Sequence, residues 1–323
     1  MTSYDLQRQE RYDETTTDYT LMLITDEDQA SQVTLEDGET YFMAHLRYCR
    51  MSRRVSAEGA VHYDFVPVPE KEGGEEHVYS KFGEVDKDTF RGGEFSELVK
   101  WGRHMLAFDD RTGIIGEIRG KDHTIIPRQI LMTGSGDEAQ KGFKCEWATL
   151  KGDELIVGSH GKVPHEEWIK RVDPDGYRVR SEDWAPIYQR IRDACGIGAD
   201  GYLIHEAVEW DPLRRCWYFF PRKLSQEPFH EPTDERKKGN NLFIEADEAF
   251  ERIETRAIGP RTPERGPSSI KLVPGHPGEF VYMKSVEIGD RTESWIGAAA
   301  LDGTLLADEM EIGAFKCEGI EIT

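Results

Sequence analysis

Acidic and hydroxyl side chains recur at one position of a repeated sequence pattern. A Phe-Lys-Cys-Glu tetrapeptide occurs twice, at residues 143–146 and 315–318, and Glu206 holds a similar place in a segment that begins at Gly201. Alignment of these segments with two further ones gives five equivalent positions, which recur every 50 to 62 residues: Ser96, Glu146, Glu206, Ser268 and Glu318. Oxygen donors without sulfur or imidazole are typical ligands of a hard cation.

The segments that would position these side chains are predicted to be short β-strands. Residues 19–25, 104–108 and 216–220 are rich in β-branched, aromatic and other apolar side chains, and each run ends in turn-forming or charged residues. A four-stranded propeller blade takes about 40–50 residues. The sequence therefore predicts an all-β fold, a single five-bladed β-propeller over residues 19–323, with a loose polar arm over residues 1–18.

The two ends of this domain are predicted to pair with each other. Residues 317–322 correspond to the segment that precedes the strands of each repeat unit, but no further strands follow them. The strand at residues 19–25 has no such segment before it. The C-terminal strand is therefore expected to be the innermost strand of the N-terminal blade, which closes the ring and removes an open edge.

One helix is predicted between the β units, over residues 184–194. Its apolar residues follow helical spacing: Trp184, Ile187, Ile191 and Ala194. Ser181 or Asp183 can cap the helix, and Gly196 should end it.

Because innermost strands line the central channel of a propeller, the five aligned positions should form a ring around the axis, here called the inner ring. Three carboxylates cannot stay ionised in a narrow channel without a cation. Roughly six to eight oxygen ligands, waters included, suit Ca²⁺ better than Mg²⁺. The alternative is that these are ordinary surface residues at strand ends.

The residues that follow the second strand of each repeat unit form a further set of polar side chains, here called the outer ring: Asp26, Asp110, Ser159, Arg222 and Lys284. Two carboxylates would face two cations across the channel. A metal–phosphate substrate needs this arrangement, with cations for phosphoryl oxygens and carboxylates for the attacking water. The alternative is a set of unrelated charges at solvated loop tips.

The overall charge restricts the partners. The chain has 41 Lys and Arg against 62 Asp and Glu, a net charge of −21. This field repels nucleic acid polymers and anionic membrane surfaces, but it allows a small phosphorylated ligand that a cation neutralises. The sequence contains no run of 18 apolar residues, so no membrane span is predicted. Residues 1–10 lack the apolar region of a secretory signal.

The cysteines predict neither a disulfide framework nor a zinc site. They are odd in number and widely spaced: Cys49, Cys145, Cys195, Cys216 and Cys317. We expect buried thiols, with a disulfide between Cys145 and Cys317 left open.

Eight stretches, in one order from about Tyr19 to the C-terminus, resemble the calcium-activated nucleotidase (soluble apyrase) family of blood-feeding arthropods and vertebrate secretory membranes. They lie at residues 91–98, 109–113, 141–147, 201–206, 221–227, 234–237, 268–271 and 316–321. Each alone is a weak signal, but eight in order are specific.

The resemblance implies a five-bladed propeller with a central Ca²⁺ that hydrolyses nucleoside di- and triphosphates, with UDP and GDP often preferred. It places the metal ligands at Ser96, Glu97, Glu146, Glu206, Ser268 and Glu318. It implies catalytic roles for Asp26, Asp110 and Arg222. It adds substrate-binding roles for Arg222, Lys284, Arg91, Glu235 and Arg236.

Three features depart from the family pattern. Glu97 stands where the family usually has Asp, which affects the reach of that ligand. The loop after Gly158 is shorter, so the base preference does not transfer. The N-terminal signal or anchor of the family is not found in this sequence, and the compartment and the oligomeric state, a homodimer included, stay open.

Two other functions fit a propeller. One is a non-catalytic module in which Ca²⁺ is structural and the faces bind a protein. The other is a lactonase-like hydrolase with a central Ca²⁺. The combination of Asp26, Asp110 and Arg222 favours phosphate chemistry over both.

Overall fold

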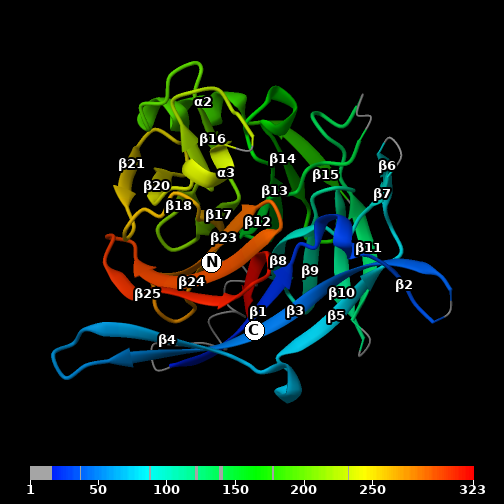
Figure 1. Cartoon of the computed structure of the whole chain (residues 1–323). Coiled ribbons are helices and arrows are strands. Elements are labelled where there is room, and N and C mark those ends of the chain that lie inside the picture. The colour runs from blue at the N-terminus through cyan, green and yellow to red at the C-terminus, as the bar shows by residue number, and fades with distance from the viewer. Residues whose placement is uncertain are drawn as a thin grey trace.

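The strands follow one another as antiparallel neighbours for most of the chain (Figure 1). The computed structural model describes residues 17–36, 38–86, 89–120, 123–137, 141–176, 178–231 and 233–323, and structural statements below refer to these. They form an all-β structure with two α-helices, as the sequence predicts for its fold class. Residues 1–16 of the predicted arm lie outside the described residues, and β1 begins at Asp18.

Five groups of four strands can be traced. The first is β8 (Phe95–Trp101), β9 (His104–Asp109), β10 (Ile114–Arg119) and β11 (Thr124–Ile130). The second is β12 (Trp147–Lys151), β13 (Glu154–Gly158), β14 (Trp168–Val172) and β15 (Val179–Asp183). The third is β17 (Ala207–Asp211), β18 (Cys216–Phe220), β20 (Leu242–Asp247) and β21 (Ile253–Ala257). The fourth is β22 (Gly266–Leu272), β23 (Glu279–Ile288), β24 (Arg291–Ala300) and β25 (Leu305–Gly313).

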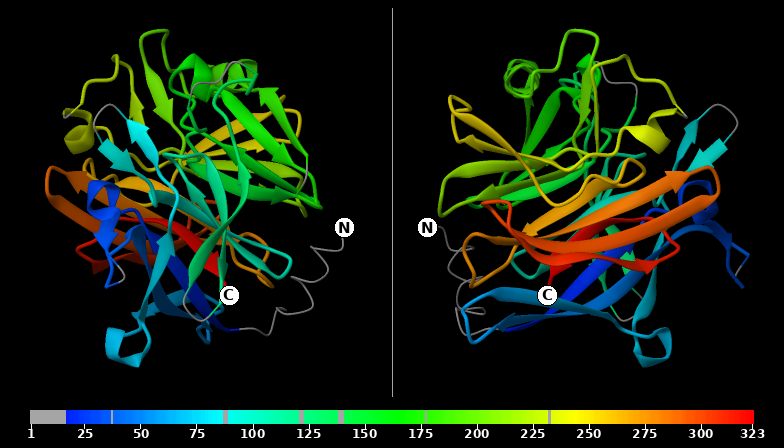
Figure 2. Two further views of the ribbon diagram at one scale, coloured as in Figure 1. Left: turned by 90° about the vertical axis from the view of Figure 1, so that its right-hand side faces the viewer. Right: turned by 60° about the vertical axis from the view of Figure 1, so that its left-hand side comes forward.

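The fifth group joins the two ends of the described chain. It consists of β26 (Cys317–Ile322), β1 (Asp18–Thr25), β3 (Thr40–Val55) and β5 (Glu75–Ser80), with β4 (Val61–Pro67) also paired to β3. The predicted closure is confirmed, because β26 and β1 pair antiparallel with Leu21 opposite Ile322. In Figure 2 the red C-terminal strand lies beside the blue N-terminal one. A single parallel pair, Tyr79 with Thr124, connects β5 to β11 and so links the fifth group to the first.

The remaining elements are short. They are β2 (Gln32–Thr34), β6 (Glu84–Asp86), β7 (Thr89–Arg91), β16 (Tyr202–Ile204), β19 (Lys223–Ser225), α3 (Thr233–Lys237), and the 3₁₀ turns η1 (Asp28–Ser31), η2 (Glu70–Glu72) and η3 (Pro164–Glu166). No helix in the described ranges is both long and apolar enough to cross a membrane.

Two-residue hairpins connect several of these strands. Gly102, Gly152 and Gly289 each occupy the first loop position with φ of +61°, +67° and +61°. A positive φ at this position matches the right-handed twist of the flanking strands and favours glycine.

The first strands of the five groups are neighbours. β8 contacts β26 and β12, β17 contacts β12 and β22, and β22 contacts β26. A Cβ atom on Gly319 of β26 would come within 2.7 Å of the Glu97 backbone, so glycine permits the close approach of β26 to β8. The N-terminal ends of these five strands therefore carry the inner-ring residues into one region.

The core consists of apolar clusters between successive groups. Neighbouring residues of one strand serve different clusters: Val157 packs with Phe108 of the first group, and Ile156 packs with Trp217 of the third. The other three interfaces contain the pairs Phe220 and Phe280, Met283 and Leu23, and Leu46 and Ala107. This alternation follows from the period of two along a β-strand.

The predicted helix is confirmed as α2 (Ala185–Ala194), inserted between β15 and β16. The N-cap residue is Trp184, without a side-chain capping bond, so neither Ser181 nor Asp183 is the cap; Asp183 Oδ1 accepts a hydrogen bond from the Ala185 N–H at 2.9 Å. Trp184 and Ile191 are buried, as predicted, but Ala194 is exposed and Tyr188 is buried in its place.

All five cysteines are free. Cys145 and Cys317 belong to different core clusters, so the disulfide between them is not formed.

Candidate metal and phosphate site

The five inner-ring side chains are all buried at the N-terminal ends of the first strands: Ser96 in β8, Glu146 before β12, Glu206 before β17, Ser268 in β22 and Glu318 in β26. Ser96 Oγ donates a hydrogen bond to Glu318 Oε2 at 3.4 Å. Ser268 Oγ donates to the carbonyl oxygen of Cys317 at 3.3 Å, next to Glu318. The two hydroxyls therefore lie beside the carboxylate of β26.

Two cationic side chains connect the three carboxylates of the inner ring. His160 Nε2 lies 3.0 Å from Glu146 Oε1 and 3.1 Å from Glu206 Oε1. Arg222 Nη1 lies 2.9 Å from Glu206 Oε2 and 3.2 Å from Glu318 Oε1. Glu206 is thus the middle carboxylate of a continuous network, and the structure brings the three acids together as the sequence pattern expects.

Arg222 is the most buried cation of this network, with 4% of its side chain exposed. Its Nη1 also donates to Ser285 Oγ at 2.6 Å, and Nη2 lies 3.6 Å from Glu287 Oε2. Burial alone would lower the pKa of Arg222, but Glu206 and Glu318 outweigh it and raise the pKa. The guanidinium is therefore permanently charged beside Glu206 and Glu318.

Burial acts to raise the pKa of both Glu146 and Glu318, but the neighbouring cations overcome this effect only at Glu146. Burial would raise the pKa of Glu146, but His160 and Lys144 hold it well below its ordinary value. Burial raises the pKa of Glu318 well above the ordinary value, although Lys316 opposes this effect. Carboxylates with pKa values driven apart in one buried cluster are typical of functional sites.

The two aspartates of the outer ring each contact a lysine. Lys316 Nζ lies 2.7 Å from Asp26 Oδ2 and 3.4 Å from Glu318 Oε1. Lys144 Nζ forms ion pairs with Asp110 Oδ2 and Glu146 Oε1. Burial raises the pKa of Asp110 to about 8, although Lys144 opposes it. Each lysine therefore links an outer-ring aspartate to an inner-ring glutamate.

Glu94 holds Asp26 and Asp110 side by side. Asp26 forms a β-bridge with Glu94, and the Asp110 N–H donates to the Glu94 carbonyl oxygen at 2.8 Å. Arg91 makes a two-pronged pair with the Glu94 carboxylate at 2.8 and 2.5 Å, and its Nη2 lies 3.4 Å from Asp28 Oδ1. Arg91 therefore lies beside the two aspartates.

Two members of the predicted outer ring do not join it. Lys284 is fully buried and lies 2.7 Å from Glu309 Oε1, near the rings of Phe220 and Tyr282. The hydroxyl of Ser159 is buried as well, and the Ser159 backbone carbonyl accepts from Trp147 Nε1 at 3.1 Å. At both places the next residue along the chain, Ser285 or His160, faces the site instead.

Glu97 points away from the inner ring. Both of its carboxylate oxygens accept from Ser269 Oγ at 3.1 Å, and Lys271 Nζ lies 3.1 Å from Oε2. Burial raises the pKa of Glu97 to about 8, although Lys271 opposes it. Its carboxylate belongs to a deeper, fully buried layer, beneath the position of Ser96.

The last two predicted residues lie on α3. Glu235 pairs with Lys223, whose neighbour is Arg222, and Arg236 is exposed. α3 contacts β23, so this helix lies next to the cationic side of the site.

The donor set of the inner ring fits a hard cation. It consists of oxygen atoms, and Asp110 Oδ1 nearby is a buried carboxylate oxygen without a hydrogen-bond donor. A buried acceptor left unpaired costs about 1–3 kcal/mol, which a cation or water would relieve. A cation that binds here competes with Lys144, His160, Arg222 and Lys316 for the same carboxylates.

Sequence reasoning missed five residues of the site, among them Ser285, which faces it in place of Lys284. Lys144 and Lys316 stand in the repeated Phe-Lys-Cys-Glu tetrapeptide itself, so the repeat held the signal. His160 and Glu94 carry no comparable signal, because only the fold places them beside the carboxylates.

The sequence model of the apyrase family matches residues 28–323. The soluble calcium-activated nucleotidase 1 of Rattus norvegicus is 39% identical over 242 residues, which cover 72% of this chain and 59% of that protein. The apyrase of Cimex lectularius is 36% identical over 80% of this chain and 72% of its own length. The apyrase apy-1 of Caenorhabditis elegans is 33% identical over 96% of this chain and 86% of its own. The match thus spans about three fifths of the rat protein and more of the other two.

Proposed function

The chain belongs to the apyrase family, and from this premise we propose that it is a Ca²⁺-dependent hydrolase of nucleoside diphosphates and triphosphates. The products are nucleoside monophosphate and phosphate, with UDP and GDP as the preferred diphosphates. The observation that carries the proposal is the contact network in which His160 and Arg222 link Glu146, Glu206 and Glu318.

The same proposal extends to the architecture. The five four-stranded groups are five blades of one propeller domain over residues 19–323. Cyclic contacts between the first strands and an apolar cluster at each of the five interfaces support this interpretation. In this arrangement the inner-ring residues of all five blades meet near the axis.

The inner ring would hold the metal through Ser96, Glu146, Glu206, Ser268 and Glu318. When bound, Ca²⁺ supplies positive charge to the phosphoryl oxygens of the substrate. Glu97 would support the ring from the deeper layer, because its carboxylate is already bound to Ser269 and Lys271.

Arg222 would bind a phosphate at the channel mouth, with Lys316 beside Asp26, Lys144 beside Asp110 and Arg91 nearby as further cations. A planar guanidinium matches two phosphoryl oxygens and stays charged at any working pH. Lys284 is buried against Glu309, so Lys316 takes the role that the sequence pattern gave to Lys284.

Asp26 and Asp110 would orient the attacking water and accept its proton. The water oxygen forms a bond to the terminal phosphorus, the phosphoanhydride bond breaks, and the shortened nucleotide leaves with the bridging oxygen. A triphosphate thus gives the diphosphate first, and the diphosphate gives the nucleoside monophosphate. A base with a raised pKa, such as Asp110 at about 8, accepts a proton more readily than an ordinary carboxylate.

Phosphate release from UDP, GDP, ADP and ATP tests the proposal, with Ca²⁺, with Mg²⁺ and with a chelator. We expect release with Ca²⁺ alone, fastest on UDP and GDP. If no nucleotide is hydrolysed while Ca²⁺ still raises the melting temperature, the enzyme assignment fails and a non-catalytic calcium-binding module remains.

A further inference from the structure

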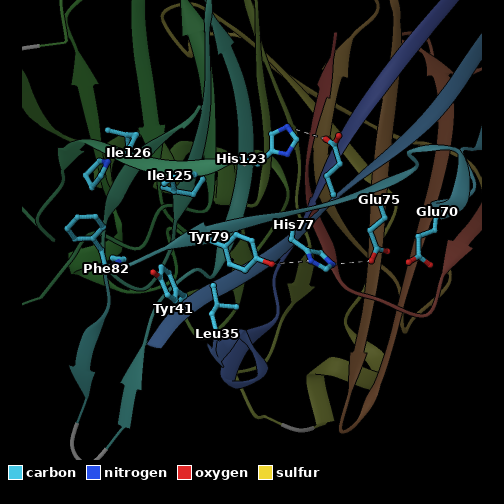
Figure 3. Close-up of a pocket in the computed structure, with 14 residues that line it drawn as sticks. Leu35, Tyr41, Glu70, Glu75, His77, Tyr79, Phe82, His123, Ile125 and Ile126 are labelled. Carbon is cyan, nitrogen blue, oxygen red and sulfur yellow. Dashed lines mark hydrogen bonds and ion pairs between the residues drawn. The ribbon is translucent and has the colours of Figure 1, made fainter. Parts of the chain in front are cut away.

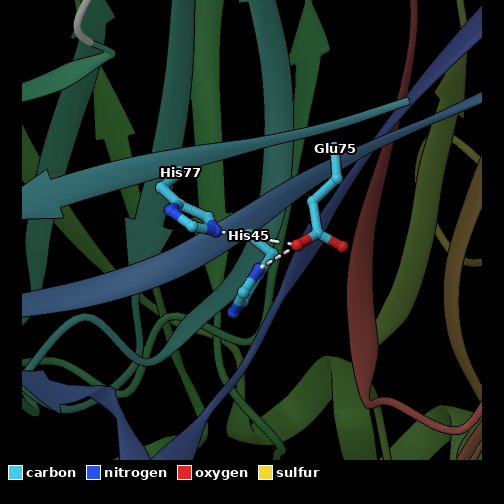
Figure 4. A group of neighbouring side chains, drawn as sticks. All are labelled: His45, Glu75 and His77. Atoms are coloured by element: carbon cyan, nitrogen blue, oxygen red, sulfur yellow. Dashed lines mark hydrogen bonds and ion pairs between the residues drawn. The ribbon is translucent and has the colours of Figure 1, made fainter. Parts of the chain in front are cut away.

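Two histidines and a glutamate face each other on the sheet of the fifth group, away from the inner ring. His45 of β3 and His77 of β5 are direct cross-strand partners, and Glu75 lies two residues before His77 on the same face of β5. Figure 4 shows the three side chains converging. Their candidate ligand atoms lie within 4.8 Å of one another.

The spacing of these atoms suits a tetrahedral metal. Glu75 Oε1 lies 3.0 Å from His45 Nδ1 and 3.6 Å from His77 Nε2. Four ligand atoms on Zn²⁺, at bonds of about 2.0–2.2 Å, stand about 3.3 Å from one another. The ion therefore fits among the three atoms with small shifts of the side chains.

The other nitrogen of each histidine already faces an oxygen. His45 Nε2 lies 3.7 Å from Glu27 Oε1, and His77 Nδ1 lies 3.3 Å from the Tyr79 hydroxyl. Metal-binding histidines almost always donate their second N–H to such a partner, which fixes the tautomer and the ring orientation. The remaining nitrogens both face Glu75 Oε1: His45 Nδ1 shares a hydrogen bond with it, which a bound ion would replace, and His77 Nε2 lies 3.6 Å away.

Glu75 is oriented by a separate contact. Arg47 forms an ion pair with Oε2, and this leaves Oε1 for the two histidines. Burial would raise the pKa of Glu75, but Arg47 and His45 lower it below the ordinary value, so the carboxylate is ionised. An ordinary ion pair with Arg47 explains the position of Glu75, but it does not explain two histidine nitrogens aimed at the other oxygen.

An ion can enter from solvent. Glu75, His77 and Tyr79 also line an open pocket, together with Glu70 and Tyr41 (Figure 3). His77 has 43% of its side chain exposed. A site with three protein ligands that opens to a pocket keeps its fourth position for water or another small ligand.

We propose that His45 Nδ1, His77 Nε2 and Glu75 Oε1 bind one Zn²⁺ ion, at a site separate from the inner ring and chemically distinct from it. Imidazole nitrogen selects Zn²⁺ over Ca²⁺, whereas the oxygen donors of the inner ring select the reverse. The chain would then hold two metals of different classes at once.

Calorimetric titration with Zn²⁺, in buffer that saturates the inner ring with Ca²⁺, tests this assignment. We expect one strong Zn²⁺ equivalent in the unaltered protein and its loss in His45→Ala, His77→Ala and the double variant. Glu27→Gln should weaken Zn²⁺ binding by roughly 10- to 100-fold through the orientation of His45. His62→Ala is the matched control, because His62 is an exposed histidine 3.6 Å from Asp64.

Cobalt provides a second measurement that does not depend on affinity. Co²⁺ in a tetrahedral N₂O-type site absorbs visible light far more strongly than hydrated Co²⁺. The absorption should appear with one equivalent of Co²⁺ and be absent in the double variant, whose fold is checked by circular dichroism. Equal Zn²⁺ binding in the double variant and the unaltered protein, or no strong equivalent in either, would overturn the proposal.

Discussion

Lys316 Nζ lies 2.7 Å from Asp26 Oδ2, so residues 290 positions apart in the chain form a buried ion pair beside the inner ring. The same lysine contacts Glu318 and Glu287. Lys144 makes the corresponding link between Asp110 and Glu146. Lys316 thus joins the fifth group to Glu287 of the fourth, whereas Lys144 joins the first group to the second. Both lysines neutralise the acids that the proposed metal would need.

Removal of the proposed base should abolish hydrolysis without removing the metal. Asp110→Asn keeps the shape of the side chain but cannot accept a proton, and we expect kcat to fall on the order of 10²- to 10⁴-fold. Calorimetry should still detect Ca²⁺. Asp200→Asn, at an exposed turn, is the control, and full activity in the Asp110 variant would exclude Asp110 as the base.

The middle carboxylate of the network should be the most sensitive metal ligand. Glu206 contacts both His160 and Arg222, so Glu206→Gln leaves two buried cations with one fewer counterion as well as one fewer ligand. We expect Ca²⁺ affinity to fall more than tenfold, or by more than about 1.4 kcal/mol. The exposed Glu251→Gln should bind Ca²⁺ normally. Unchanged affinity in both variants would remove Glu206 from the ligand set.

A lysine that competes with the metal should weaken metal binding. Lys144→Met removes the ammonium between Asp110 and Glu146, so those carboxylates become available to Ca²⁺ and its affinity should rise on the order of tenfold. The metal-free protein should melt at a lower temperature, because a buried acid pair loses its counterion. Exposed Lys141→Met serves as control. Weaker Ca²⁺ binding would show that Lys144 supports the site instead of competing with the ion.

At the interface between the fourth and fifth groups, two side chains of the fifth group bind one carboxylate, that of Glu279. Arg53 makes hydrogen bonds of 2.9 and 2.7 Å to Glu279, and the Tyr63 hydroxyl donates to it at 2.6 Å. Arg53→Met should therefore lower the free energy of unfolding by about 1.5–3 kcal/mol, measured by urea titration. The neighbouring Arg54 is 73% exposed, and Arg54→Met should change stability little. Equal effects of the two substitutions on the free energy of unfolding would contradict a stabilising role for the Arg53–Glu279 contact.

Acid should destabilise the first group through Glu117. Burial acts to raise its pKa, but Arg119, His104 and Arg128 lower it from 4.5 to about 2. A depressed carboxyl pKa contributes stability above pH 4.5, and this contribution disappears as the pH falls towards 2. The difference in unfolding free energy between the unaltered protein and Glu117→Gln should shrink over this range. Glu72→Gln, at an exposed residue, should show no such pH dependence.

Ring closure and the acidic inner ring could be predicted from the sequence because both rest on repeats. The equivalence of Glu146, Glu206 and Glu318 follows from their places in similar segments. The pairing of β26 with β1 follows from counting which segments lack partners. Such arguments need only the order of elements along the chain, not the direction of single side chains.

Which side chains of the outer ring face the site could not be predicted in this way. Lys284 and Ser159 were each one residue from the side chain that faces the site, Ser285 and His160. Lys284 and Ser285 are successive residues of β23, whose side chains point to opposite faces, so an error of one position exchanges site for core. A register shift between Pro267 and Ser269 on the partner strand of β23 shows why the count alone could not fix this position. Ser159 and His160 follow the end of β13 at Gly158, where a count along the strand no longer applies.

The pairing of β26 with β1 also limits the order in which the strands can assemble during folding. Leu21 and Ile322 are paired neighbours although almost the whole chain lies between them. Pairings of such sequence separation are slow, because a long loop must close before they contribute stability. During synthesis, β1 can pair with β3 but cannot pair with β26 until residues 317–322 emerge from the ribosome. Glu318 lies on that same strand, so the acidic cluster cannot be complete before then.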